Sequence, residues 1–98
     1  MSDHLKHGSI HEAARQGDVP AIRAFISDGH NVREKDGAGA SALAWAILHN
    51  EVEAVRCLLE LGADPNETSA QGNNAIGLAL FLQHTEIVEL LCEAGAQN

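Results

Sequence analysis

Residues 36–68 have the sequence DGAGASALAWAILHNEVEAVRCLLELGADPNET and form the clearest of three similar units in this 98-residue chain. Gly62, near the end of that unit, lies midway in sequence between Gly29 and Gly95. The apolar positions that keep the same spacing are Ile10, Leu43 and Ile76; Ala13, Ala46 and Ala79; Ala21, Ala54 and Ile87; Ile22, Val55 and Val88; and Phe25, Leu58 and Leu91. A fixed period of about 33 residues is typical of stacked units that cannot bury their apolar faces alone. The chain is therefore predicted to be a stack of three repeats.

Each unit is predicted to contain two helices. In the middle unit, Ser41 can cap the apolar run 42–48, and a second helix follows from about Val52 until Gly62 ends it. The same pattern predicts helices near 9–16 and 19–28, and near 75–82 and 85–94, with Asp18 and Asn74 as further caps. Arg56 and Glu60 lie one helical turn apart, a spacing that predicts an ion pair on the second helix.

The three units contain several short motifs at fixed places. They are Asp36-x-x-Gly39-x-Ser41-Ala42-Leu43-x-x-Ala46, Glu53-Ala54-Val55-Arg56-x-Leu58-Leu59-Glu60-x-Gly62-Ala63-Asp64-x-Asn66, His84-Thr85-Glu86-Ile87-Val88-Glu89-Leu90-Leu91-x-x-x-Gly95-Ala96, and Ile10-His11-Glu12-Ala13-Ala14-Arg15-x-Gly17-Asp18. With these motifs, the chain resembles the ankyrin-repeat family over residues 9–96. The resemblance implies an all-α, helix-turn-helix solenoid of three stacked repeats joined by hairpin-like loops. It implies one domain, 1–98, with repeats at about 3–35, 36–68 and 69–98.

The chain departs from the family pattern at the helix starts. The family's Thr-Pro-Leu-His is replaced by Ser41-Ala42-Leu43-Ala44 and by Asn74-Ala75-Ile76-Gly77. The hydroxyl–imidazole network that this motif forms in the family is therefore expected to be largely missing. Gln83 stands where a glycine usually ends the first helix, which predicts backbone strain there.

Composition excludes several classes of function. A net charge of −8 repels phosphate backbones, so nucleic acid is not an expected partner. The chain has neither an apolar run of about 18 residues nor a signal-peptide core near Met1, so we expect no membrane partner and a cytoplasmic location. Cys57 and Cys92 both lie in apolar helical stretches and are predicted to be buried free thiols.

Catalytic and metal-binding sites find little support. His4, His7 and His11 would share one face of a continuous helix and could then hold a metal ion, but Gly8 and Ser9 indicate that the helix starts after them. No nucleophile is paired with a base and an orienting group, so we predict neither an enzyme nor a bound cofactor or metal.

The resemblance implies a protein-binding surface on the loop tips and the outward side of the first helix of each repeat, which line a concave face. The candidate positions are Arg15, Gln16, Ala38, Ala40, Trp45, Leu48, His49, Gln71, Asn73, Phe81 and Leu82. Phe81 and Leu82 are unexpected there, because a solvated surface normally carries polar residues. Together with Leu48 they either form an exposed apolar patch or turn inward to fill gaps beside small neighbours.

Two functions remain open at this stage. The first is a non-catalytic module that binds a protein partner through the concave face. The alternative is a structural protein that self-associates, as a homodimer for example, through its third repeat, where residues 78–82 are strongly apolar and no polar cap follows.

Overall fold

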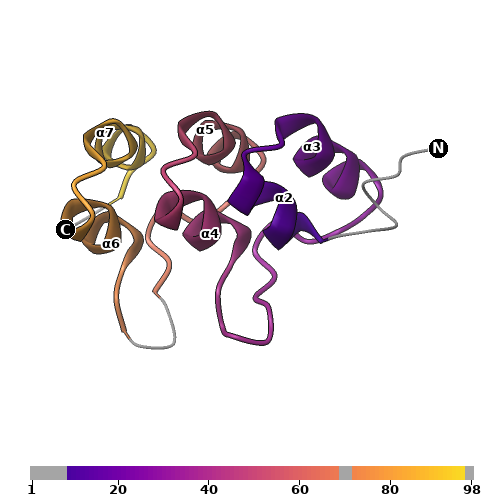
Figure 1. The fold of residues 1–98 in the computed structure, drawn as a ribbon, viewed down its shortest axis with the longest axis horizontal. Coiled ribbons are helices and arrows are strands. Elements are labelled where there is room, and N and C mark those ends of the chain that lie inside the picture. The colour runs from indigo at the N-terminus through magenta and orange to yellow at the C-terminus, as the bar shows by residue number, and fades with distance from the viewer. Residues whose placement is uncertain (1–8, 69–71, 97–98) are drawn as a thin grey trace.

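A computed structural model describes residues 9–68 and 72–96 as two rows of helices. The helices are α2 (Ile10–Gln16), α3 (Val19–Ser27), α4 (Ala42–Leu48), α5 (Val52–Glu60), α6 (Ala75–Phe81) and α7 (Thr85–Glu93). In Figure 1, α2, α4 and α6 lie side by side in one row, and α3, α5 and α7 form the second row. Neighbouring helices of each row contact one another, so the all-α stack of three helix pairs is confirmed.

The loops between helix pairs are hairpin-like, as predicted. Isolated β-bridges join Lys35 to Ser41 and Thr68 to Asn74, and the described parts of both loops extend from the row of α2, α4 and α6 (Figure 1). Asp36 fixes the tip of the first loop, because its Oδ1 accepts hydrogen bonds from the backbone N–H groups of Ala38 and Ala40 at 2.9 and 3.0 Å. An aspartate in this role replaces backbone partners that a loop otherwise lacks.

Helix starts follow the predicted caps. Ser41 Oγ accepts from the N–H of Ala44 at 3.1 Å, and Asn74 Oδ1 accepts from the N–H of Gly77 at 2.7 Å. Asp18 caps α3 in the same way, with its Oδ1 3.1 Å from the nitrogen of Ala21. Each cap satisfies an N–H that has no partner within the helix, so Ser and Asn replace the family's threonine without loss of the helix start.

The turn inside each helix pair requires a left-handed residue. Gly17, Asn50 and Gln83 occupy equivalent places, with φ of 72°, 54° and 62°. Glycine adopts this conformation without a Cβ clash, and asparagine adopts it more readily than most residues. Gln83 has neither advantage, which confirms the predicted departure from a glycine at this turn.

Gln83→Gly is expected to raise the free energy of unfolding by about 1 kcal/mol, since a left-handed residue with a Cβ costs roughly 1–2 kcal/mol. The melting temperature should rise by about 4 °C in a chain of this size. Gln83→Ala is the matched control, because alanine keeps the Cβ and should bring no gain. Equal stabilisation by alanine and glycine in thermal unfolding would refute the strain.

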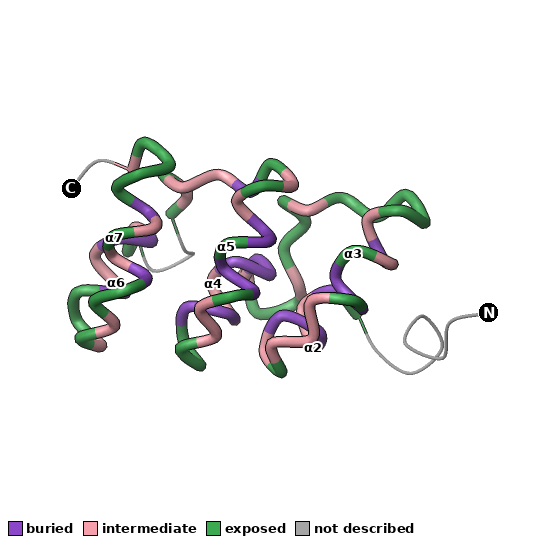
Figure 2. The backbone as a smooth tube through the Cα atoms, turned by 90° about the horizontal axis from the view of Figure 1, so that it is seen from above, coloured by how far each residue is buried: buried purple, intermediate pink, exposed green. Residues whose placement is uncertain are grey.

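The core is built from small and branched side chains at the repeating positions. Leu43, Ile47, Val55, Leu58 and Ile87 are fully buried, with alanines between them at the helix contacts. Figure 2 shows buried positions along every helix, whereas the turns and loops are mostly exposed. Small side chains allow the helices to approach closely, and this produces thin layers in a body that measures 40 × 24 × 19 Å.

Ion pairing on α5 differs from the prediction. The predicted pair between Arg56 and Glu60 is wrong, because Arg56 Nε lies 3.3 Å from Glu53 Oε1 in the same helix. Glu60 instead accepts from Arg23 of α3, at 3.2 Å, and so links the first two helix pairs. Both pairs are exposed, so each contributes less than about 1 kcal/mol.

The prediction that both cysteines are buried holds for one of them. Cys57 is buried in α5, and desolvation raises the pKa of its thiol. Cys92 is exposed on α7, so the prediction was wrong there. Cys92 is equivalent to Leu59, which is only half-buried on α5, and among the described residues no further helix pair lies beyond α7.

Candidate protein-binding surface

The exposed side of α2, α4 and α6, together with the loop tips 36–40 and 72–74, forms one continuous surface, called the inner surface below. Three positions of each helix pair face it: Glu12, Trp45 and Leu78; Arg15, Leu48 and Phe81; and Gln16, His49 and Leu82. Along each set, the side chains change from charged or polar in α2 to apolar in α6. The inner surface therefore has a polar end and an apolar end.

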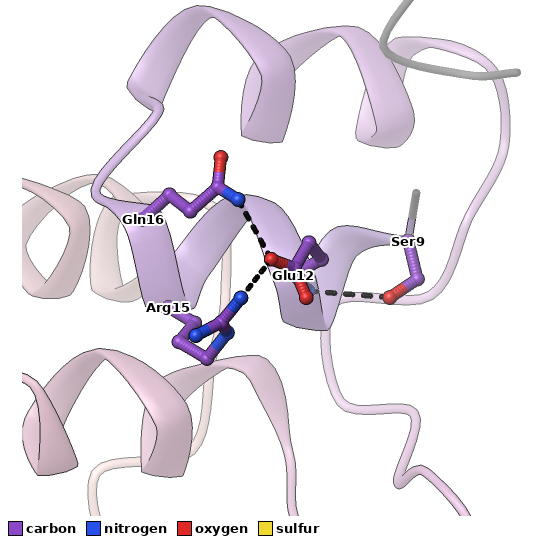
Figure 3. A network of polar contacts seen from close by, with 4 residues as sticks. All are labelled: Ser9, Glu12, Arg15 and Gln16. Carbon is purple, nitrogen blue, oxygen red and sulfur yellow. Dashed lines mark hydrogen bonds and ion pairs between the residues drawn. The ribbon is translucent and has the colours of Figure 1, made fainter. Parts of the chain in front are cut away.

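The polar end is held together by Glu12, as Figure 3 shows. Its carboxylate accepts hydrogen bonds from the guanidinium of Arg15 and, at 2.7 Å, from the side-chain amide of Gln16. Chiefly because of the bond from Arg15, the pKa of Glu12 is below its usual range. The candidate residues Arg15 and Gln16 therefore form hydrogen bonds within the chain, to Glu12. They lie on α2, whereas the apolar candidates Phe81 and Leu82 lie at the end of α6.

The middle of the inner surface is organised around Trp45. The indole Nε1 donates to Asp36 Oδ2 at 2.7 Å, and the ring stacks on His49 with centroids 6.0 Å apart. The pKa of Asp36 is lowered, first by the hydrogen bond from the backbone of Ala40 and then by the bond from Trp45. Trp45 is therefore half-buried, and its hydrogen bond to Asp36 links α4 to the loop 36–40 that precedes it.

The apolar end consists of Leu48, Leu78, Phe81 and Leu82. Phe81 is 83% exposed and Leu48 is 42% exposed, whereas Leu78 and Leu82 are half-buried. Phe81 therefore does not fill a gap in the core, which was the alternative interpretation of the sequence. Exposed aromatic and aliphatic side chains beside a polar rim are typical of interaction sites.

A cavity of about 160 Å³ opens on the inner surface between α4 and α6. Its walls include the candidate residues Ala38, Ala40, Leu48 and Asn73, and also Ala44, Glu67 and Leu78. The last three were not among the predicted site residues. Leu78 could have been found by its spacing, since it stands one repeat after Trp45, but no sequence signal brings Glu67 into the cavity. Of the other candidates, Gln71 lies outside the described residues.

Glu67 reaches back from its loop to the preceding helix pair. Its Oε2 accepts a hydrogen bond from the hydroxyl of Ser41 at 2.5 Å, and Ser41 is 1% exposed. Burial of the carboxyl raises the pKa of Glu67, and the bond from Ser41 opposes that effect without cancelling it. This contact links the start of α4 to the loop that follows α5.

Glu67→Gln is expected to raise the free energy of unfolding at pH 8 by about 1 kcal/mol, the usual scale for a partly desolvated charged group. A raised carboxyl pKa gives stability that is present below its ordinary value of 4.5 and is lost as the pH rises through the folded-state value. The gain from glutamine should therefore vanish near pH 4. Urea unfolding from pH 4 to 8 measures it, with the exposed, equivalent Glu34→Gln as control. A wild type more stable than Glu67→Gln at pH 8 would refute this.

A second exposed apolar side chain, Leu80, lies on α6 at the end of the stack. Leu80 is 48% exposed, although the equivalent Ala14 and Ile47 are completely buried. Those two residues have a following helix pair, whereas within the described ranges no helix pair follows α6 and α7. The exposed area therefore continues from Phe81 on the inner surface to Leu80 on the end of the stack.

Within 9–68 and 72–96 the chain contains neither a cluster of metal ligands nor a membrane-spanning helix. These residues contain no group of three His, Cys, Asp or Glu side chains that could hold a metal, and His4 and His7 lie outside them. His11 instead donates from Nε2 to the carbonyl of Glu34 at 2.8 Å. No described helix has both the length and the apolarity needed to span a bilayer.

Comparison with known proteins decides the family. A profile of ankyrin repeats, in three copies, matches residues 10–98. The chain belongs to the ankyrin-repeat family. The resemblance in the sequence is thus confirmed, and members of this family generally bind other proteins.

Two solved ankyrin-repeat domains are similar to this ankyrin-repeat chain. One is from Acinetobacter baumannii AYE, with 33% identity, a TM-score of 0.83, and coverage of 90% of this chain and 47% of that one. The other is the ankyrin-repeat domain of human ASB11, with 33% identity, a TM-score of 0.81, and coverage of 90% and 40%. The chain thus spans less than half the length of either structure. The comparison with curated proteins returned no match.

Proposed function

We propose that this ankyrin-repeat chain is a non-catalytic module that binds a protein partner through its inner surface. The observation that carries the proposal is the exposure of Phe81, 83%, beside Leu48 and the cavity between α4 and α6. Interfaces are dominated by a few large, central side chains that become desolvated on binding. Phe81 and Leu48 have that character, and Asn73 and His49 supply a polar rim.

The polar end of the inner surface has a different role in this proposal. Arg15 and Gln16 are already hydrogen-bonded to Glu12, so binding through them would require breaking that network or adding to it. We place the energetic centre at the apolar end and assign Arg15 and Gln16 to the margin of the interface. Trp45 and His49 form the boundary between the two.

Affinity capture from the native lysate tests the proposal. The wild-type chain should retain a partner that the double variant Phe81→Ser/Leu82→Ser does not retain. The matched control is Leu80→Ser, which removes an exposed apolar side chain from the same helix but outside the inner surface. If the double variant retains the partner and Leu80→Ser loses it, the proposal is wrong and the binding site is at the end of the stack.

A second candidate function is self-association through the end of the stack, which the exposure of Leu80 favours. Two copies would then bury Leu80 and Phe81 against each other. Static light scattering at two concentrations distinguishes this candidate, since the apparent mass should increase with concentration and Leu80→Ser should abolish the increase. A constant monomer mass at high concentration would eliminate it.

A further inference from the structure

Two grooves occupy equivalent places along the stack, each between neighbouring helices of the inner row. The groove between α2 and α4 is lined by His11, Arg15, Asp36 and Trp45, among others. The cavity between α4 and α6 is its counterpart, with Ala44 and Leu48 in place of His11 and Arg15, and with Leu78 in place of Trp45. The two grooves can therefore be compared position by position.

In the first groove, the chain supplies both members of a donor–carboxylate pair. The indole of Trp45 provides an apolar ring and an N–H, which donates to the carboxylate of Asp36 at 2.7 Å. In the second cavity, Leu78 stands at the position of Trp45 and carries no donor. The position of Asp36 corresponds to Ser69, which lies outside the described residues, but a carboxylate from another position, Glu67, lines that cavity.

The carboxylate of Glu67 is only partly satisfied. Oε2 accepts from Ser41, and no other described residue donates a hydrogen bond to the carboxylate. Glu67 also lines a groove with Lys35 and Arg33, whose charges lower its pKa, but neither cation donates a hydrogen bond to it. Lys35 Nζ donates to the carbonyl of Thr68 at 2.7 Å, and Arg33 Nε donates to the carbonyl of Gly62 at 2.9 Å. Glu67 is half-buried and lines a mainly apolar cavity, and its carboxylate has the capacity to accept a further donor.

The size of the cavity limits what can enter. A cavity of about 150 Å³ is sufficient for benzene, with six carbon atoms, and this cavity measures about 160 Å³. A lysine side chain beyond its Cβ has three carbons and one nitrogen, an apolar stem with a cationic end. Its stem would match the walls, and its ammonium would match the carboxylate.

The charge of the chain favours the same occupant. Residues 1–35 contain five basic and five acidic residues, whereas residues 36–98 contain one basic and nine acidic residues. The whole net charge of −8 thus belongs to the second and third repeats, on either side of the cavity. Such a field attracts cationic partners and adds to the local attraction of a carboxylate.

We propose that the cavity between α4 and α6 binds a lysine side chain of the partner, with the stem against Leu48 and Leu78 and the ammonium on the carboxylate of Glu67. This inference rests on the proposed function, since it assumes that a protein lies on the inner surface. It adds the chemistry of that partner: a basic segment that places a lysine beside an apolar residue packed on Phe81.

n-Butylammonium chloride tests the inference without the partner, by NMR titration of the full chain at pH 8. The methyl signals of Leu48 and Leu78 should shift and saturate. n-Butanol, added at matched ionic strength, has the same stem without the charge and should bind at least about fivefold more weakly. Glu67→Gln should weaken butylammonium binding by about fivefold and leave butanol binding unchanged.

Equal affinities of the two probes, no saturable shift at Leu48 and Leu78, or an unchanged affinity of Glu67→Gln for butylammonium would each overturn the inference. Glu34→Gln should leave the titration unchanged, because Glu34 is the exposed equivalent of Glu67 and does not line this cavity. The two proposals therefore fail separately: the lysine site fails in this titration, and the protein-binding function fails in the capture experiment.

Discussion

Ile47→Ala is expected to lower the free energy of unfolding by about 3 kcal/mol, within the range for removing a large aliphatic side chain from a core. Ile47 is completely buried, and it lies on α4, which packs against α2, α5 and α6. The substitution would leave an unfilled space between two helix pairs. In a stack, each helix pair depends on its neighbours for burial, so losing this side chain would weaken the interfaces between repeats and the cooperativity of unfolding.

The equivalent change one repeat later is the matched control for Ile47→Ala. Leu80 occupies the place of Ile47 in the third repeat but is 48% exposed, so Leu80→Ala should cost less than about 1 kcal/mol. Urea unfolding of the two variants measures both values. Equal losses of stability would mean that Leu80 is buried to the same extent as Ile47. This would contradict the exposure of Leu80 at the end of the stack.

Phe81→Ser is expected to weaken binding of the captured partner by at least about 30-fold, which corresponds to about 2 kcal/mol. The cause is the loss of a large aromatic side chain that becomes desolvated at the centre of the interface. Because Phe81 is 83% exposed in the free chain, the melting temperature should change by less than about 2 °C. Isothermal titration calorimetry and thermal unfolding of the same sample give both numbers.

Leu80→Ser again serves as the control for Phe81→Ser, because it removes an exposed apolar side chain from the adjacent residue. It should keep the partner's affinity within about twofold, because Leu80 is on the end of the stack. An unchanged affinity of Phe81→Ser together with a large fall in melting temperature would show that Phe81 supports the fold. The binding site would then have to be elsewhere.

The architecture could be predicted from the sequence because each repeat carries the same local signals. The constant spacing of Gly29, Gly62 and Gly95 indicates the stack, and Ser41 and Asn74 mark helix starts that the structure confirms. Such signals act within a few residues of one another. They are therefore readable without knowledge of tertiary packing.

The contacts between repeats were harder to predict. Arg56 had two acidic neighbours within one helical turn, and the spacing alone did not decide between Glu53 and Glu60. In the structure Glu60 pairs with Arg23 of another repeat, and Arg56 pairs with Glu53. Cys92 was predicted to be buried because its neighbours are apolar, but it is exposed, at a position where even the equivalent Leu59 of the middle repeat is only half-buried.

The exposed apolar side chains of the candidate surface could be predicted in part. The apolar character of Leu48, Phe81 and Leu82 broke the expected polarity of the first helices, and the structure exposes Phe81 and Leu48. Glu67 was missed because its entry into the cavity depends on how the loop 61–68 folds back towards Ser41. No periodic pattern encodes that path.

The most direct test of the central claim is an amide NMR map of the chain with and without its captured partner. If the inner surface binds, the largest shifts should fall within residues 37–40, 45–49 and 72–82, with little change on the solvent side of α3, α5 and α7. Large shifts confined to α5 and α7, with residues 45–49 and 72–82 unaffected, would contradict the account.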